Sequence, residues 1–241
     1  MKSERPASEP RSAEEPVCPI CRDKGWLSPD VPYDHPDFGI PIPCRCQKAQ
    51  RNQRLMRFCR LPSNTVHMTF DSFVPRPGLE DAVRWAKAMA DGERTVGRLT
   101  IMGHVDRGKT HLAVAIVRRW IERGVPAKYA RVPDMLAELR RGFDPDSPHS
   151  YYYEYQRLKD VPLLLLDDLG MEKQSDWALE QLDNLIDHRI VEGLPFIATT
   201  NSPMNELPHR LASRLQRKVP NLPAVVLMLK VGEYRLCPEG S

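Results

Sequence analysis

The chain has 241 residues, 41% of them hydrophobic and 28% charged, and a formal net charge of +3. This balance is typical of a folded protein in water, and the length allows one α/β domain with a small appendage. The sequence contains no run of about 18 apolar residues and no signal-peptide core near its start, so we expect a cytoplasmic protein without a membrane partner. Prolines and mixed charges over residues 1–15 predict a disordered tail.

Four cysteines follow the tail in two close pairs. Cys18 and Cys21 form C-P-I-C, and Cys44 and Cys46 form C-R-C. Two such pairs can supply the four thiolates of a tetrahedral zinc site, and a short segment rich in glycine and proline needs such a ligand in order to fold. An iron–sulfur cluster and a redox-active C-x-x-C remain alternatives, although no thioredoxin-like pattern surrounds the pairs. Zinc is our interpretation.

A basic helix is predicted directly after the second cysteine pair, and together they form a module over residues 16–60. Cys59 in this helix is expected to pack rather than react. The helix could bind phosphates or an acidic protein, or could simply be a solvated connection between two domains. Cations recur in it at three-residue intervals: Lys48, Arg51, Arg54, Arg57 and Arg60.

Residues 61–241 alternate short apolar runs with helical patterns, which predicts a doubly wound α/β fold. We expect a five-stranded parallel sheet with helices on both faces. Ser175 is the predicted N-cap of the longest helix. The predicted strands are 98–102, 127–132, 163–168, 195–201 and 224–230, and the predicted helices are 110–123, 133–141 and 175–192.

The stretch GHVDRGKT, residues 103–110, matches the phosphate-loop pattern G-x-x-x-x-G-K-[ST]. A strand leads into it and a helix follows it, as a working phosphate loop requires. Lys109 is expected to reach the β- and γ-phosphates, and the Thr110 hydroxyl to bind Mg²⁺. The predicted nucleotide-binding residues are Gly103, His104, Val105, Asp106, Arg107, Gly108, Lys109, Thr110 and His111.

Two acids close the all-leucine run at 163–166. Asp167 is expected to hold Mg²⁺ through water, and Asp168 to orient or deprotonate the attacking water. The loop letters are also similar to the first motif of translational GTPases, and residues 167–170 fit D-x-x-G. However, no N-K-x-D that would read guanine occurs in the chain. We therefore expect ATP rather than GTP as the nucleotide.

Several motifs resemble those of AAA+ ATPases, and in particular the DnaC/DnaI/IstB helicase-loader family. The resemblance implies that Asn201 senses the γ-phosphate, that Arg214 is an arginine finger beside Arg210, and that Arg235 is a sensor 2-like residue. The motifs are MTFDSF (68–73), GKTHLA (108–113), LLLLDDLGMEK (163–173), PFIATTN (195–201), HRLASRL (209–215) and GEYR (232–235).

The same resemblance implies an ATP-hydrolysing loader of a DnaB-type replicative helicase that assembles with itself into a ring or spiral and contacts single-stranded DNA. The zinc module would dock on the helicase. Basic residues and tyrosines in 140–159 are DNA-contact candidates, unless the tyrosines pack on the core. Two alternatives remain. One is an IstB-type transposition helper; the other is a nucleotide-binding adaptor with little hydrolysis, because Asp106 and Arg107 replace the glycine and small residue usual in loaders.

Overall fold

The computed structural model describes residues 18–93, 95–147, 150–170 and 175–230. The predicted tail and Arg235 lie outside these residues. The chain divides into two compact units, Met1–Arg51 and Asn52–Ser241. The division falls inside helix α1 (Arg45–Cys59), before the boundary that the sequence predicts at residue 60. None of the described helices is both long and apolar enough to cross a membrane.

The first unit is held around its cysteines. Strands β1 (Trp26–Leu27) and β2 (Ile42–Pro43) pair antiparallel, and α1 begins directly after Cys44. The side chains of Cys18, Cys21 and Cys44 are buried, with Leu27 packed against them. No other side chain is buried in the described part of this unit.

The second unit contains the predicted five-stranded parallel sheet, in the order β4-β5-β6-β3-β7. The strands are β3 (Arg98–Met102), β4 (Ala127–Arg131), β5 (Leu163–Leu169), β6 (Phe196–Thr200) and β7 (Ala224–Met228). The prediction of five parallel strands is therefore confirmed. Strand β5 continues past the two acids to Leu169, and its pairing with β6 is irregular between Leu166 and Leu169. Asp168 has a left-handed φ of 60° at this irregularity.

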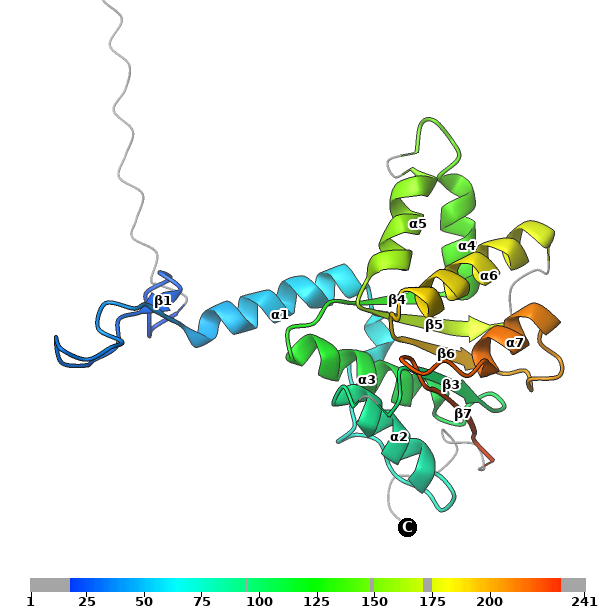
Figure 1. Ribbon diagram of the computed structural model, residues 1–241, viewed down its shortest axis with the longest axis horizontal. Coiled ribbons are helices and arrows are strands. Elements are labelled where there is room, and N and C mark those ends of the chain that lie inside the picture. Colours follow the sequence, from blue (N-terminus) through cyan, green and yellow to red (C-terminus); the bar gives the residue numbers. More distant parts are fainter. Residues whose placement is uncertain (1–17, 94, 148–149, 171–174, 231–241) are drawn as a thin grey trace, which may run out of the picture. The chain divides into compact units, whose positions relative to one another are not determined.

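Helices cover both faces of the sheet, as the sequence predicts (Figure 1). The helices are α2 (Glu80–Ala90), α3 (Lys109–Glu122), α4 (Val132–Arg141), α5 (Tyr151–Asp160), α6 (Asp176–Val191) and α7 (His209–Gln216), with a short 3₁₀ helix at Ser63–Thr65. Alternate leucines of β5 enter opposite cores: Leu163 and Leu165 face α2 and α3, whereas Leu164 and Leu166 face α4, α5, α6 and α7.

Two helix N-termini are closed by serine side chains. Ser175 accepts a hydrogen bond from the Ala178 N–H at 3.2 Å, which confirms the predicted cap of α6. Ser150 accepts from the Tyr153 N–H at 3.3 Å and begins α5. The sequence did not predict α5 as a helix; α4 and α5 form a helical hairpin within residues 132–160.

Two arginines are almost completely buried and donate hydrogen bonds to backbone carbonyls. Arg189 is 0% exposed and binds carbonyls at the end of α5 and the start of β6. Arg98 is 1% exposed and binds the carbonyls of Arg214 and Arg217 at the end of α7, and that of Leu222. Both side chains satisfy carbonyls that a helix end leaves without partners.

Candidate nucleotide site and cysteine cluster

The glycine loop connects β3 directly to α3, as the sequence predicts. Gly108 adopts φ 86° at the start of α3. Gly103 adopts φ 152°, and a Cβ there would lie 3.0 Å from the Leu229 carbonyl oxygen. Asp106 has a left-handed φ of 59°, which aspartate tolerates better than most residues. The loop therefore keeps its turn despite the aspartate that departs from the loader pattern.

Lys109 lies at the base of this loop and is 6% exposed. Its Nζ donates a hydrogen bond to the His104 carbonyl oxygen at 2.6 Å. Burial lowers the pKa of Lys109, while the carboxylates of Asp168 and Asp167 act in the opposite direction. The ammonium group is thus held between the loop and the two acids of β5.

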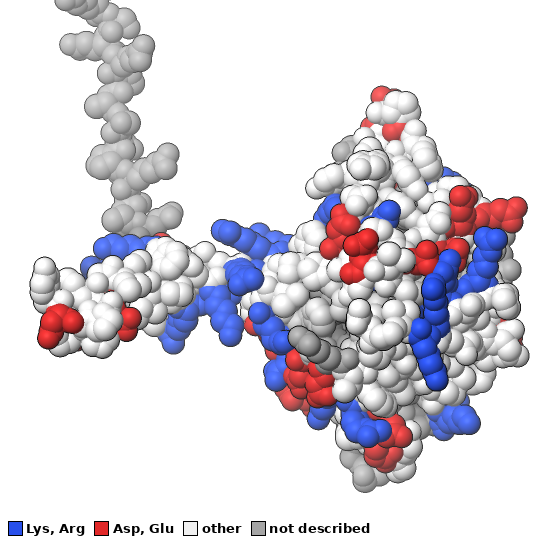
Figure 2. All heavy atoms as spheres, viewed as in Figure 1, with Lys and Arg blue, Asp and Glu red and all other residues white. Residues whose placement is uncertain are grey.

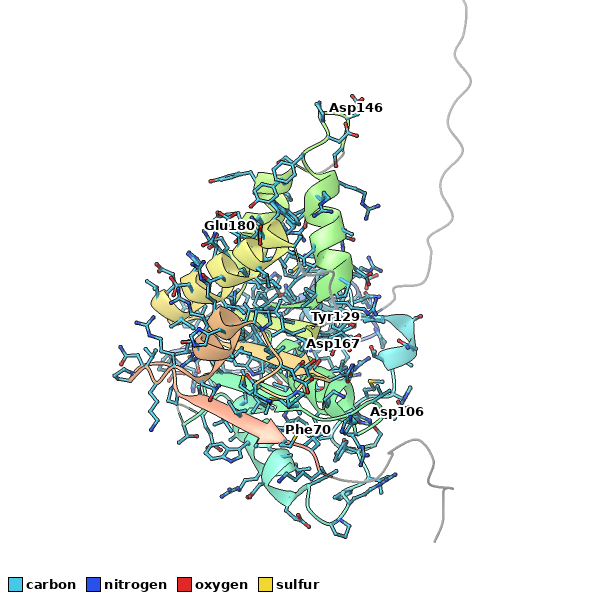
Figure 3. All side chains as sticks on the ribbon, turned by 90° about the vertical axis from the view of Figure 1, so that its right-hand side faces the viewer. Phe70, Asp106, Tyr129, Asp146, Asp167 and Glu180 are labelled. Atoms are coloured by element: carbon cyan, nitrogen blue, oxygen red, sulfur yellow. The ribbon has the colours of Figure 1, made fainter. Side chains whose placement is uncertain are left out.

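The Asp167 carboxylate is the centre of a hydrogen-bonded cluster. Oδ1 accepts from Thr110 Oγ1 at 3.1 Å and from Thr199 Oγ1 at 2.5 Å, and Oδ2 accepts from the Tyr129 hydroxyl at 2.9 Å. Figure 3 shows Tyr129 beside Asp167. A hydroxyl and a carboxylate brought together in this way are suitable ligands for a hydrated Mg²⁺. The structure therefore brings together Thr110 and Asp167, the two residues predicted to hold the metal.

Asp168 has a different environment from its neighbour. Its carboxylate is paired with Arg131 Nε at 3.1 Å, and its backbone N–H donates to Thr199 Oγ1 at 3.1 Å. Arg131 also reaches Asp134, at 3.4 Å. Both predicted acids are thus positioned by side chains of the neighbouring strands.

Tyr129, Arg131 and Thr199 are site residues that the sequence analysis missed. Tyr129 and Arg131 lie two residues apart on β4, which pairs with β5 in a register that places Arg131 opposite Asp167. Burial, together with the Asp167 charge, raises the pKa of Tyr129, so its hydroxyl remains a donor. In the sequence, these residues could have been found as polar side chains in predicted strands that neighbour the strand with the two acids.

His111 joins the glycine-loop helix to the segment 68–73. Its Nε2 lies 2.9 Å from the Thr69 carbonyl oxygen and 3.3 Å from Ser72 Oγ, and its ring meets Phe73 edge-on. Burial lowers the pKa of His111. The segment that resembles the one ahead of the loader core is thereby fixed beside the loop.

Asn201 and Arg214 occupy different environments. Asn201 is half-buried and follows β6, which lies between the loop strand β3 and the acid strand β5. Arg214 on α7 binds Asp183 at 3.2 Å and also Asp187, both on α6. Its guanidinium is therefore paired within its own chain, whereas Arg210 on the same helix is exposed.

The four predicted zinc ligands form one compact cluster. All four sulfur atoms lie within 4.8 Å of one another, with Cys18–Cys44 at 3.8 Å and Cys21–Cys46 at 3.4 Å. Four sulfurs around zinc, each about 2.3 Å from it, are about 3.8 Å apart, whereas a disulfide needs about 2.05 Å. The cluster therefore fits a tetrahedral metal and not two disulfides.

Backbone amides favour the thiolate form of Cys18 and Cys21, whereas the neighbouring sulfur of Cys21, together with burial, raises the pKa of Cys46. The Gly25 N–H donates to Cys21 Sγ at 3.3 Å. Hydrogen bonds from the backbone of Cys21 and Ile20 lower the pKa of Cys18 to about 7. The thiolate is the form that binds metal, so the backbone donors at Cys18 and Cys21 agree with the geometry of the cluster.

A phosphate loop, acids on β5 and the strand order of the sheet together define a nucleotide-binding protein of the AAA+ class. The model of the family described as IstB-like ATP binding protein matches residues 45–214, and the chain belongs to this family.

Relatives include both insertion-sequence proteins and helicase loaders. An ATP-binding protein in an insertion sequence of Mycobacterium tuberculosis is 32% identical over 63% of this chain and 60% of its own length. The replicative helicase loader DnaI of Bacillus subtilis is 21% identical over 84% of this chain and 64% of its own. The chain thus spans less than two thirds of the length of these relatives.

Solved structures show the same fold. The crystal structure of the DnaC helicase loader has a TM-score of 0.60 at 22% identity, and the match covers 70% of this chain and all of that one. The replication initiator DnaA bound to AMPPCP and single-stranded DNA has a TM-score of 0.62 at 19% identity, over 73% of this chain and 53% of that one. At these identities the likeness concerns the fold.

Proposed function

We propose that this protein is an ATP-dependent loader of a replicative hexameric helicase. The observation that carries the proposal is the cysteine cluster in front of an AAA+ core, an arrangement that resembles loaders of the DnaI kind. The match to DnaI over 84% of the chain supports it. In this proposal the zinc-bound unit contacts the helicase and the core binds ATP.

The nucleotide site supplies the chemistry expected of a phosphate-loop ATPase. Backbone N–H groups of the loop and of the first turn of α3 would surround the β-phosphate. Lys109 would exchange the His104 carbonyl for phosphate oxygens, and Thr110 and Asp167 would hold Mg²⁺, which neutralises phosphate charge when bound. Asp168 would orient the attacking water, and Asn201 would contact it from the adjacent strand end.

Self-assembly is proposed from Arg214. As a finger it would leave Asp183 and Asp187 and stabilise transition-state charge at a neighbour's site. Arg214→Ala should then bind ATP normally but lose about three orders of magnitude of turnover. Mixing it with Asp168→Asn should restore part of the activity, because mixed assemblies contain intact sites. A mixture that co-assembles and stays inactive would remove the support for a finger acting between subunits.

Single-stranded DNA contact is proposed for the α4–α5 hairpin. Tyr152 and Tyr153 are 74% and 55% exposed and could stack on bases. Tyr151, in contrast, is half-buried and donates its hydroxyl hydrogen bond to Gln181. The three tyrosines thus divide between the two interpretations of the sequence: one packs on the core and two are exposed.

The deciding experiment is co-purification of the full chain with the replicative helicase of its host in the presence of ATP. Wild type should form a complex, and Cys44→Ser should lose it while still binding ATP. Lys109→Ala should weaken ATP binding. In direct titrations, wild type should bind ATP more tightly than GTP. Failure of wild type to bind the helicase under any nucleotide condition would contradict the loader function.

A transposition helper is the second candidate. It is favoured by the 32% identity to the insertion-sequence protein of Mycobacterium tuberculosis. The same pulldown with a transposase encoded beside the gene distinguishes the two, since the helper would bind the transposase and not the helicase.

A further inference from the structure

The first part of α1, residues 45–54, is polar on all sides. It contains no apolar side chain larger than Ala49 apart from the ligand Cys46, and the chain has no Asp or Glu between Asp37 and Asp71. A surface helix normally has an apolar face or pairs of opposite charge along it. This segment has neither, so its own sequence stabilises it poorly.

Its positive charges also oppose helix formation. The first turn contains no acid, and Arg45 lies at the positive end of the helix dipole. Cations three residues apart repel one another along the rest of the helix. The helix is anchored near its two ends, by Cys46 in the cysteine cluster and by Leu55, Met56 and Cys59 in the core of the second unit, and the cations between them pack on neither. Such a concentration of positive charge is suited to binding a polyanion.

The three-residue spacing distributes these cations around the helix. Each step advances about 4.5 Å and turns about 300°, so five successive cations cover roughly two thirds of the circumference. Arg45, Lys48, Arg51, Arg54 and Arg57 are all exposed. Figure 2 shows Lys and Arg atoms both above and below α1. An acidic protein face would meet only one side of this helix.

A duplex meets both sides. The major groove of DNA is about 12 Å wide, admits an α-helix and has phosphates along both walls. We infer that α1 binds duplex DNA, with its cations on the two phosphate backbones of the major groove. The exposed side chains between the cations, including Gln50 and Gln53, are uncharged and can donate to base edges. The inference does not rest on the proposed helicase loading or on the single-strand contact of α4–α5.

The test compares two triple variants of the full chain that lose the same charge. Lys48→Gln/Arg54→Gln/Arg57→Gln removes cations of α1, and Arg84→Gln/Lys87→Gln/Arg119→Gln removes three exposed cations of α2 and α3. Binding of a labelled 20-base-pair duplex is measured by fluorescence anisotropy at several salt concentrations. The α1 variant should bind at least about tenfold more weakly at 0.1 M salt, and the slope of log Kd against log salt should fall by about 3. The control should match wild type.

Two controls show whether a loss of duplex binding comes from the lost charge and not from unfolding. Circular dichroism and ATP titration report whether the variants stay folded, and Lys48→Arg/Arg54→Lys/Arg57→Lys should retain the wild-type slope. The inference is overturned if both triples lose the same affinity, if neither loses any, or if a single strand of equal length binds wild type more tightly than the duplex. Loss of helicase binding with unchanged duplex binding would assign α1 to a protein partner instead.

Discussion

The two units of the chain are stabilised by different means. In the described part of the second unit, a parallel sheet separates two clusters of buried apolar residues, and the nucleotide site lies where the strands end. In the described part of the first unit, the buried side chains are those of three cysteines. The proposed zinc would therefore supply the stability that the first unit lacks, whereas the second folds by burial of apolar surface.

This difference decides how strongly a single substitution destabilises each unit. The apolar clusters of the second unit offset the cost of burying Arg98, Arg189 and Lys128, which are all less than 10% exposed. The described part of the first unit has no comparable cluster of buried apolar side chains. Changes at its ligands should abolish its structure, whereas single changes in the core should lower stability in measurable steps.

The largest expected effect is therefore loss of the metal. Structural zinc contributes on the order of 10 kcal/mol, so Cys44→Ser should unfold residues 18–51 and leave the unfolding of the core unchanged. Trypsin should then cut at Arg22 and Lys24, while the thermal transition of the core stays in place. Cys59→Ser is the matched control. Cys59 is 0% exposed in the core, so this change should keep the metal and destabilise the core by about 1 to 3 kcal/mol. Equal protection of the metal-free and metal-bound chains would contradict the comparison.

The next effect concerns Arg189 in the core. Its guanidinium donates to the carbonyls of Leu158 at 2.9 Å, Val161 at 2.8 Å and Pro195 at 2.6 Å. Burial lowers the pKa of Arg189 to about 9. Arg189→Met would remove the guanidinium donor from the Leu158 and Val161 carbonyls, while the Pro195 carbonyl would keep the Leu164 N–H at 3.4 Å. Urea unfolding should then show a loss of about 3 to 5 kcal/mol.

The exposed Arg84 provides the control for Arg189. Arg84→Met should change the free energy of unfolding by less than about 0.5 kcal/mol. A loss below about 1 kcal/mol for Arg189→Met would mean that water replaces the guanidinium, and that the core does not depend on this contact.

A smaller effect with a defined pH dependence is expected at Lys128. Burial, with the nearby cations Arg60 and Arg157, lowers its pKa from 10.5 to about 8. Between these values the unfolded chain holds a proton that the folded chain has lost, so this group's contribution to stability rises as the pH rises from about 8 to 10. Lys128→Met should therefore stabilise the core by about 1 to 2 kcal/mol at pH 7, and the gain should shrink towards pH 10. A gain that is independent of pH would assign the effect to packing alone.

The sequence predicted the features that are set by local patterns, and it missed those that depend on contacts between segments. The four cysteine ligands, the glycine loop, the five strands and the two acids are local patterns, and the structure contains them all. The contacts of Tyr129 and Thr199 with Asp167 depend on which strands are neighbours, and periodicity along the chain does not specify that. Arg98 and Arg189 have the sequence context of surface charges, because their carbonyl partners lie in distant segments. Asp168 was expected at a strand end, yet it lies at an irregularity inside β5.

The smallest expected effect tests whether Asp167 is tuned by its neighbours. The Tyr129 hydroxyl donates one of three side-chain hydrogen bonds to this carboxylate, at 2.9 Å. Tyr129→Phe removes that bond and keeps the ring, which should cost about 1 kcal/mol, or roughly fivefold in ATP affinity, when Mg²⁺ is present. Without Mg²⁺ the affinity should be unchanged, because Asp167 would act on the nucleotide through the metal. The exposed Tyr152 gives the control, since Tyr152→Phe should bind ATP normally in both conditions. If Tyr129→Phe weakens ATP equally with and without Mg²⁺, the tyrosine supports the site through packing, and the hydrogen-bonded cluster on β4, β5 and β6 does not set the position of the metal-binding carboxylate.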